Sequence, residues 1–202
     1  MSMKNPSSEY DRLFLQALDI LNSCNDVNAV KDYIFAIEDQ DYRDVTLAKI
    51  GVLLVTQNRP DDGMHFVRAI KNTMERADAL LDIAREYIKR GGRLRASEML
   101  TESASTAEDI ERSTWETPSM LLQICAELRG LAFPTEALAM LRRAISFAQK
   151  GGDFDSAKVL GGGAVLLAEW GYRDEAISAA NLISQAELHR AILERLSGPG
   201  QP

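Results

Sequence analysis

The sequence has few of the residues that form metal sites or nucleophilic catalytic sites. Its 202 residues include two histidines and two cysteines, and no Cys-x-x-Cys pair occurs. Neither His65 nor His189 has a second ligand residue three or four positions later, so a structural zinc site has no ligand set. Serine is common, but the Gly-x-Ser-x-Gly elbow of hydrolases is absent. We expect no catalytic residue, no metal and no cofactor, and therefore a protein that is not an enzyme.

The chain also lacks a basic excess. It carries 23 Lys and Arg against 30 Asp and Glu, a net charge of −7. Binding to nucleic acid or to anionic lipid needs a basic surface, so we expect neither. The charge is uneven, because residues 10–42 hold two basic and seven acidic side chains, a net charge of −5 (two minus seven). This acidic end is best explained as a solvated capping surface, and a docking site is the alternative.

Long apolar runs and prolines are scarce as well. No stretch of about 18 apolar residues occurs, so no membrane-spanning segment is expected. Residues 1–6 lead into an amphipathic pattern without the apolar core of a signal peptide, so we expect no signal peptide and a cytoplasmic location. The 6 prolines stand mostly at expected helix starts or in the tails. Because alternating β-branched residues are nearly absent, the pattern favours an all-α fold.

What the sequence does contain is an internal repeat. A segment of 33 to 41 residues recurs five times, and its copies begin near Tyr10, Arg43, Arg76, Thr117 and Ser156. When each start is counted as position 0, position 4 reads Phe14, Leu47, Leu80, Leu121 and Leu160. Position 11 reads Leu21, Leu54, Tyr87, Leu128 and Leu167. Such a period is typical of stacked helix pairs, because each repeat can bury its apolar face only against its neighbours.

Within each repeat the apolar pattern predicts two helices. Positions 4, 7, 8 and 11 carry apolar or small residues, which is the spacing of one face of a first helix. The pattern breaks near position 15, which reads Asn25, Asn58, Gly91, Ala132 and Gly171. A second helix follows, with apolar or small residues at positions 20 and 24. Small residues at positions 8 and 20, such as Gly51 and Gly63, allow the two helices of a hairpin to approach closely.

This spacing resembles the tetratricopeptide repeat, which has a large residue at position 4, Gly or Ala at 8, Tyr at 11 and Ala at 20. The clearest copies are RADALLDIAREYIKRGGRLRASEML and SAKVLGGGAVLLAEWGYRDEAISAA. No repeat has Trp at position 4 or Pro at position 32, so the repeats are divergent. The resemblance implies an α-solenoid of about five helix-turn-helix repeats in a right-handed superhelix. It would form a single domain over residues 10–196, with a capping helix at 184–196 and disordered ends at 1–9 and 197–202.

Irregular spacing and turn residues predict several boundaries. The third and fourth repeats are 41 and 39 residues long. The extra residues of the third repeat lie within SASTAEDIERSTWETPS and predict a second helix that is about two turns longer. We expect Thr117 and Pro118 to be the N-cap and first residue of the next helix. The turn after the fourth repeat is expected at 151–153, with Asp153 or Asp155 as the cap.

The two cysteines, Cys24 and Cys125, lie three repeats apart. Stacked helix layers about 10 Å thick would separate them by roughly 30 Å, which is far beyond the reach of a disulfide. We therefore expect two free thiols that behave as small buried hydrophobic side chains, in a reducing compartment.

Gly161, Gly162 and Gly163 fall at positions 5 to 7, inside the first helix of the fifth repeat. A phosphate-binding loop is a weak explanation, because no Gly-Lys-Ser/Thr follows. Three interior glycines cost a helix about 2–3 kcal/mol relative to alanine, at roughly 1 kcal/mol each. Close packing against the preceding helix or a tolerated kink is the simpler compensation. The alternative is a notch on the inner face in which a partner's backbone lies close to the helix.

The resemblance also implies where a partner binds. In the repeat family the first helices line a concave groove, and positions 2, 5, 9, 12 and 13 commonly meet the ligand. Mapped onto this chain, the expected partner-binding residues are Val52, Val55, Leu81, Arg85, Ile88, Lys89, Leu122, Arg129, Gly161 and Val165. An apolar strip beside Arg85, Lys89 and Arg129 suits an amphipathic or acidic peptide.

Several alternatives stay open at this point. Arg85 and Lys89 can instead pair with Asp82 and Glu86 on their own helix, as part of a solvated face. The leading functional hypothesis is a non-enzymatic scaffold or adaptor for a protein partner. The other hypotheses are a secretion-type or assembly chaperone, although the first repeat is acidic where such a chaperone exposes an apolar helix, and a regulatory module of a larger complex. Self-association by end-to-end stacking is a further possibility.

Overall fold

The computed structural model describes residues 6–109, 116–151 and 154–197. In these ranges it contains eleven α-helices and no strand, which confirms the all-α prediction. The helices are α1 (Pro6–Cys24), α2 (Val27–Phe35), α3 (Gln40–Thr56), α4 (Pro60–Arg68), α5 (Thr73–Lys89), α6 (Arg93–Glu108), α7 (Glu116–Gly130), α8 (Pro134–Gly151), α9 (Phe154–Glu169), α10 (Arg173–Ala180) and α11 (Ala186–Ser197). The chain divides into two compact units, which we name the N-terminal unit (1–109) and the C-terminal unit (110–202).

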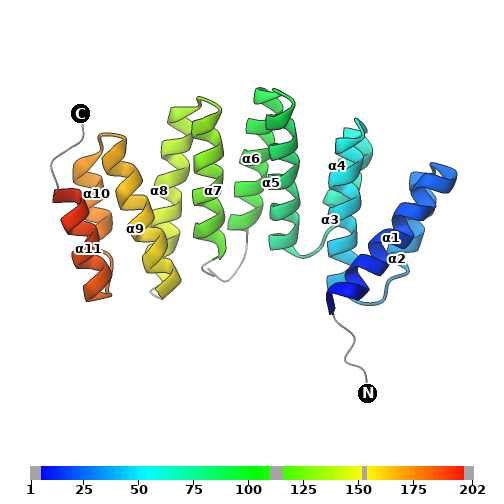
Figure 1. Cartoon of the computed structure of the whole chain (residues 1–202), viewed down its shortest axis with the longest axis horizontal. Helices are drawn as coiled ribbons and strands as arrows, with labels where there is room; N and C mark the ends of the chain where they lie inside the picture. The colour runs from blue at the N-terminus through cyan, green and yellow to red at the C-terminus, as the bar shows by residue number, and fades with distance from the viewer. Residues whose placement is uncertain (1–5, 110–115, 152–153, 198–202) are drawn as a thin grey trace, which may run out of the picture. The chain divides into compact units, whose positions relative to one another are not determined.

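Consecutive helices pack as hairpins, one hairpin for each repeat. In the N-terminal unit α1 packs on α2, α3 on α4, and α5 on α6 (Figure 1). In the C-terminal unit α7 packs on α8 and α9 packs on α10. First helices of neighbouring repeats also touch, as α1 and α3, α3 and α5, and α7 and α9 do. The last helix, α11, packs on α9 and α10, where the sequence predicted a capping helix.

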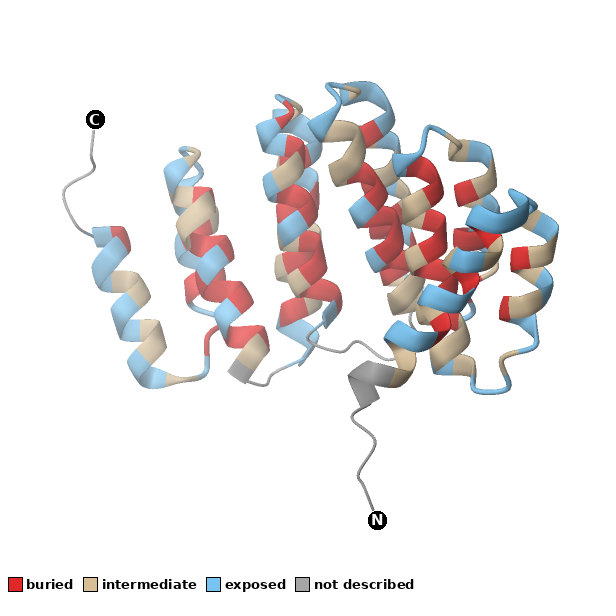
Figure 2. Cartoon of the chain, turned by 45° about the vertical axis from the view of Figure 1, so that its right-hand side comes forward, coloured by how far each residue is buried: buried red, intermediate tan, exposed pale blue. Residues whose placement is uncertain are grey.

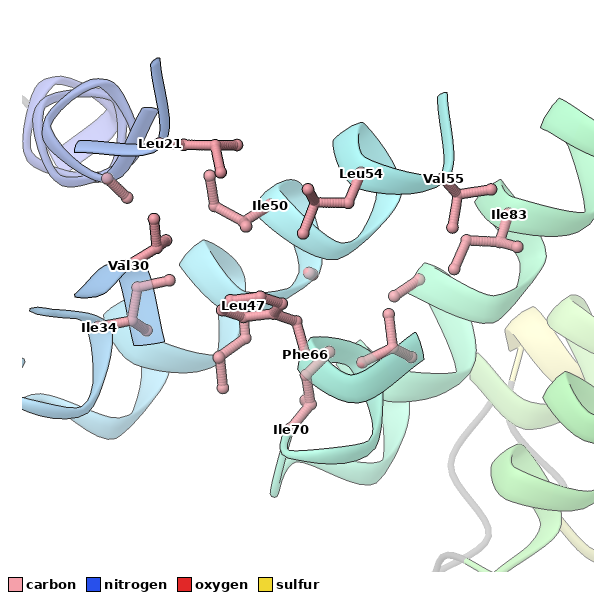
Figure 3. Close-up of a cluster of buried hydrophobic side chains, with 14 of the residues drawn as sticks. Leu21, Val30, Ile34, Leu47, Ile50, Leu54, Val55, Phe66, Ile70 and Ile83 are labelled. Carbon is pink, nitrogen blue, oxygen red and sulfur yellow. The ribbon is translucent and has the colours of Figure 1, made fainter. Parts of the chain in front are cut away.

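The core of the N-terminal unit is built from the repeat positions that the apolar pattern singled out. Figure 3 shows the labelled side chains of this cluster converging from α1 to α5. At position 24 Ile34, Val67 and Leu100 are all fully buried, and Leu47 at position 4 is buried with them. Buried residues gather on the helix faces that meet other helices (Figure 2). The hairpins are therefore stabilised by apolar burial, because an isolated helix of this length is marginal in water.

The break at position 15 has the same backbone conformation in every repeat. Its five residues all have positive φ: Asn25 (50°), Asn58 (63°), Gly91 (74°), Ala132 (60°) and Gly171 (88°). In the last four repeats the next N–H donates to the carbonyl oxygen of position 11, at 2.8–3.0 Å. This is the Schellman arrangement that ends a helix with one left-handed residue. The turn between the two helices is thus set by a single position.

The small residues at positions 8 and 20 face each other, as predicted. A Cβ atom built on Gly63 of α4 would lie 2.5 Å from the carbonyl oxygen of Gly51 in α3. A Cβ atom built on Gly51 would lie 2.7 Å from Cγ2 of Val67. Since real Cβ atoms do not approach neighbours so closely, both positions need glycine for the helices to pack at this distance.

The glycine run in α9 packs closely at two of its three residues. A Cβ atom on Gly163 would lie 2.8 Å from Cγ1 of Ile145 in α8, the preceding helix. A Cβ atom on Gly161 would lie 3.3 Å from Cδ1 of Ile192 in α11. Gly162 is exposed, and its nearest such neighbour is Leu122, at 3.9 Å. The helix stays continuous, so helix packing offsets the propensity cost of Gly161 and Gly163.

The longer second helix of the third repeat is as predicted, and the second helix of the fourth repeat is long as well. α6 has 16 residues and α8 has 18, against 9 in α4 and 8 in α10. The difference of seven residues between α4 and α6 is about two turns at 3.6 residues per turn.

Four local predictions were wrong. Ser197 is the last residue of α11 and not part of a disordered tail. α1 begins at Pro6, so residues 6–9 are helical instead of disordered, because proline is well suited to the first helical position. α7 already includes Glu116, so Thr117 lies inside the first turn and is not the N-cap. Cys24 is exposed, because it ends α1 beyond the last buried residue of that helix, whereas Cys125 is buried as expected.

Other predicted boundaries fall partly outside the described residues. Residues 1–5, 198–202 and Asp153 are not described. α9 begins at Phe154, so Asp155 lies in its first turn and is not the cap. Within the residues that the structure describes, no helix has the length and apolarity needed to cross a bilayer.

Candidate interaction surface

The ten residues expected to bind a partner divide between the two units. Val52, Val55, Leu81, Arg85, Ile88 and Lys89 belong to the N-terminal unit, and Leu122, Arg129, Gly161 and Val165 belong to the C-terminal unit. Every one of them lies on a first helix, α3, α5, α7 or α9.

In the N-terminal unit the apolar members differ in exposure. Val55 and Leu81 are only 1% and 2% exposed, so they support the face from beneath and offer little surface. Val52 and Ile88 are partly exposed. Val52 packs against the core cluster of this unit, which fixes its position. A partner would therefore meet Val52 and Ile88 before it meets the other two.

The two cations on α5 form ion pairs within their own helix. Arg85 lies 3.3 Å from a carboxylate oxygen of Asp82, and Lys89 lies 3.5 Å from one of Glu86. This is the solvated-face arrangement that the sequence left open. Ion pairs with exposed members contribute only about 0.2–1 kcal/mol, so a partner's carboxylate can compete for both cations.

Glu86 also links α5 to α3 through Arg90. The Arg90 guanidinium donates to Glu86 at 2.9 Å and to the carbonyl oxygens of Val55 and Thr56 at 3.1 and 2.6 Å. These carbonyls end α3, where a cation is favourable because the helix dipole is negative there. No sequence pattern singles out Arg90, because its role depends on contacts with both α3 and α5.

The opposite end of α5 is acidic. Burial raises the pKa of the Glu75 carboxyl, and the neighbouring carboxylates of Asp78 and Asp44 add to the shift. Asp44 is itself buried, and it accepts hydrogen bonds from the backbone N–H groups of Lys71 (3.2 Å) and Asn72 (2.8 Å). Carboxylates therefore gather at the start of α5 and cations at its end, as the helix dipole favours.

In the C-terminal unit the predicted cation has an aromatic partner. The Arg129 guanidinium carbon lies 4.2 Å from the centroid of the Trp170 ring, which is a cation–π contact between the end of α7 and the residue that follows α9. Within the described residues Arg129 has no carboxylate partner. The contact orients the guanidinium and leaves its N–H donors available to an acidic ligand.

Apolar residues lie on the same two helices. Leu122 and Val165 are partly exposed, and Leu122 packs against the core cluster of the C-terminal unit. Gly161 is buried beneath Ile192, so it offers no surface of its own.

Burial raises the pKa of the Cys125 thiol to about 11, so this side chain is neutral and unreactive at neutral pH.

A hollow that the sequence analysis missed lies among α8, α9 and α10. Its volume is about 390 Å³, and it is lined by Arg142, Ile145, Leu167, Asp174, Glu175, Ser178, Ala179 and Leu182. Arg142 spans part of it with two hydrogen bonds to Glu175, at 2.7 and 2.8 Å. Leu182 follows α10 and is 39% exposed. A large apolar residue outside the helical pattern is the one sequence signal that could have indicated this hollow.

Comparison with known proteins gives the fold but no closer relationship. No family model and no curated protein matches the chain. The crystal structure of BtubC (BKLC) from P. vanneervenii matches 96% of this chain and 75% of its own, with a TM-score of 0.50 and 14% identity. A candidate kinesin light chain from Podosopora anserina with nearly identical TPR-like repeats matches 98% of this chain and 100% of its own, with a TM-score of 0.49 and 14% identity.

The repeat spacing, the hairpins and the match to BtubC agree on one architecture. Within the residues of α1–α10, each repeat supplies two helices joined by a left-handed residue, with buried residues at position 24. The chain therefore has the fold of a divergent tetratricopeptide-like helical repeat.

Proposed function

We propose that this protein is a non-enzymatic scaffold or adaptor that binds a segment of a partner protein along its first helices. Repeat folds of this kind typically present extended surfaces for protein partners. The cytoplasmic location expected from the sequence is part of the proposal, and two free cysteines are in keeping with a reducing compartment.

The observation that carries the proposal is the Arg129–Trp170 contact. The two residues come from different repeats, and Arg129 is exposed while Trp170 is partly exposed. Tryptophan and arginine are the residues most enriched where binding energy concentrates in interfaces. An arginine that stacks on a ring is already oriented, so less rotamer entropy is lost when it binds a carboxylate.

The partner chemistry follows from this contact and from the partly exposed apolar residues on the first helices. Leu122 and Val165 offer partly exposed apolar surface on α7 and α9. In the N-terminal unit Val52 and Ile88 offer similar surface on α3 and α5, and α5 also carries Arg85 and Lys89. A segment that carries both apolar and acidic side chains satisfies both kinds of residue.

Affinity capture from the source cells tests the proposal, with two variants that remove the same charge. The site variant is Arg85→Ala, Lys89→Ala and Arg129→Ala. The matched control replaces three exposed cations outside the predicted surface, Arg68→Ala, Lys71→Ala and Arg190→Ala. Loss of the captured partner from the site variant but not from the control supports the proposal, and the remaining binding should depend less on salt. Equal capture by the two variants rejects the surface assignment.

A further inference from the structure

A second hollow lies at the acidic end of the N-terminal unit. It has a volume of about 400 Å³ and is formed by α1, the end of α2, the loop that follows and the start of α3. The residues that line it are Glu9, Arg12, Leu13, Gln16, Tyr33, Ala36, Ile37, Glu38, Asp39 and Tyr42. We name it the α1–α2 pocket. It shares no residue with the surface considered above.

The inner part of the α1–α2 pocket is apolar and aromatic. Leu13 is buried, and Ile37 packs against the core cluster of the unit. The Tyr33 hydroxyl donates to Oε1 of Gln16 at 2.6 Å, which ties α2 to α1. The Tyr42 ring lies edge-on to Tyr10, with ring centroids 4.4 Å apart. Both tyrosines of the pocket are therefore held in place before any ligand binds.

The rim of the pocket is acidic. Asp39 accepts the N–H groups of Asp41 and Tyr42 at 2.9 and 3.1 Å, which fixes its carboxylate at the start of α3. The neighbouring Glu38 is exposed, and within the described residues its carboxylate has no side-chain partner. Arg43 donates to the Ile37 carbonyl oxygen at 2.9 and 2.6 Å, so the loop that carries these groups is braced.

The cation that already lines the pocket is occupied. Arg12 pairs with Glu9 through two of its nitrogens and donates to Oε1 of Gln16 at 3.2 Å. The carboxylates of Glu38 and Asp39 are thus not neutralised by it. The surrounding segment 10–42 has a net charge of −5 (two basic minus seven acidic residues), so its field attracts cations.

We propose that the α1–α2 pocket receives a lysine or arginine side chain from a basic segment of a partner protein. The aliphatic stem would lie on Leu13, Ile37 and the tyrosine rings, as long cationic side chains do on apolar surfaces. The charged head would meet Glu38 and Asp39 at the rim, and a tyrosine face adds a cation–π contact. This is the docking alternative for the acidic end, with the chemistry of its occupant now specified. This proposal does not rest on the proposed function. Its ligand is basic where the other is acidic, and the two sites share no residue.

Amide NMR of the full chain with a short peptide tests this proposal. The probe is acetyl-Leu-Arg-Leu-amide, and its matched control replaces the arginine with citrulline, which has the same shape and no charge. The arginine peptide should shift the amides of residues 36–42 in a saturable way. The citrulline peptide should bind more weakly, by up to about fivefold. A fivefold loss of affinity corresponds to the upper end of what an exposed ion pair contributes. Equal shifts from the two peptides, or no shift at residues 36–42, overturn the proposal.

A pair of variants locates the charge. Glu38→Gln should weaken the arginine peptide about fivefold, since it removes one rim charge without changing the side-chain shape. Glu98→Gln, an exposed carboxylate on α6 that lies outside the pocket, should leave the affinity unchanged. Both residues are exposed, so the amide spectra of the variants should match that of the wild type in the absence of peptide. If both variants bound the arginine peptide equally weakly, the effect would come from net charge alone. The α1–α2 pocket would then be rejected as the binding site.

Discussion

Gly51 and Gly63 face each other across the α3–α4 hairpin so closely that neither position has room for a side chain. A Cβ atom on Gly63 would lie 2.5 Å from the Gly51 carbonyl oxygen, and one on Gly51 would lie 3.0 Å from the Gly63 carbonyl oxygen. Both neighbours are backbone atoms, which cannot move without separating the two helices. The spacing of this hairpin is therefore set by two glycines at repeat positions 8 and 20.

Gly63→Ala should destabilise the N-terminal unit by about 1–3 kcal/mol, the usual cost of overpacking a close helix contact. Alanine would otherwise favour the helix, so the loss must come from the contact. Urea unfolding followed by far-UV circular dichroism measures it. Gly130→Ala is the control, because Gly130 lies in α7 and has no neighbouring atom within 4 Å of a built Cβ. A stable Gly63→Ala protein would contradict the close approach.

Ala132→Gly should stabilise the C-terminal unit by about 1 kcal/mol. Ala132 has φ of +60°, and a left-handed conformation costs a residue with a Cβ atom roughly 1–2 kcal/mol. Glycine avoids this cost, but the unfolded chain with glycine is more flexible, which offsets part of the gain. Gly171→Ala is the reverse substitution at the same position of the next repeat. It should destabilise the C-terminal unit by a similar amount. Thermal unfolding of both variants checks the pair. If the two changes shifted stability in the same direction, the turn assignment would fail.

The two turns show what could be predicted from the sequence. The break at position 15 was visible because Asn and Gly are the residues that tolerate positive φ, and Ala132 was recognised only through its register. The same register predicted the contact of Gly51 with Gly63, because hairpin geometry repeats when the spacing repeats. Such features depend on neighbours in the same hairpin, and they are encoded locally.

The features that could not be predicted depend on side chains from separate helices. The sequence placed Arg129 on the expected surface, but the Trp170 ring beneath it comes from the next repeat. Val55 and Leu81 were expected at the surface and are buried, and Val55 packs in a cluster that includes residues of α2, α4 and α5. The α1–α2 pocket needs three elements to converge, and only its excess of acidic residues was visible in the sequence.

The stability of the N-terminal unit should respond to pH through Glu75. Burial, with nearby carboxylates, raises the pKa of this carboxyl in the folded chain. Such a group stabilises the fold fully below its unfolded pKa, and this contribution is lost as pH rises through the higher folded pKa. Glu75→Gln should therefore exceed the wild type in unfolding free energy at neutral pH, by less than about 1 kcal/mol for a half-buried group, and the difference should vanish in acid.

Glu175 gives the opposite sign and serves as the internal control. The hydrogen bond from Arg142 lowers the pKa of its carboxyl in the folded chain. Its contribution is present above the unfolded pKa and is lost as pH falls through the folded pKa. Glu175→Gln should thus be less stable than the wild type at neutral pH, with a difference that shrinks in acid. Urea titrations at several pH values check both variants, and parallel profiles would contradict the assigned causes.

The central claim is that a partner docks on the first helices. The most direct test compares how far the partner protects the side chains of Trp170 and Tyr172. Trp170 contacts Arg129 on the first helix α7, whereas Tyr172 lies 5.5 Å from the Arg142 guanidinium on the second helix α8. Hydroxyl-radical footprinting of the captured complex compares the oxidation of the two rings with that in the free protein. The account predicts that the partner protects Trp170 and leaves Tyr172 unchanged. Protection of Tyr172 without protection of Trp170 would contradict it.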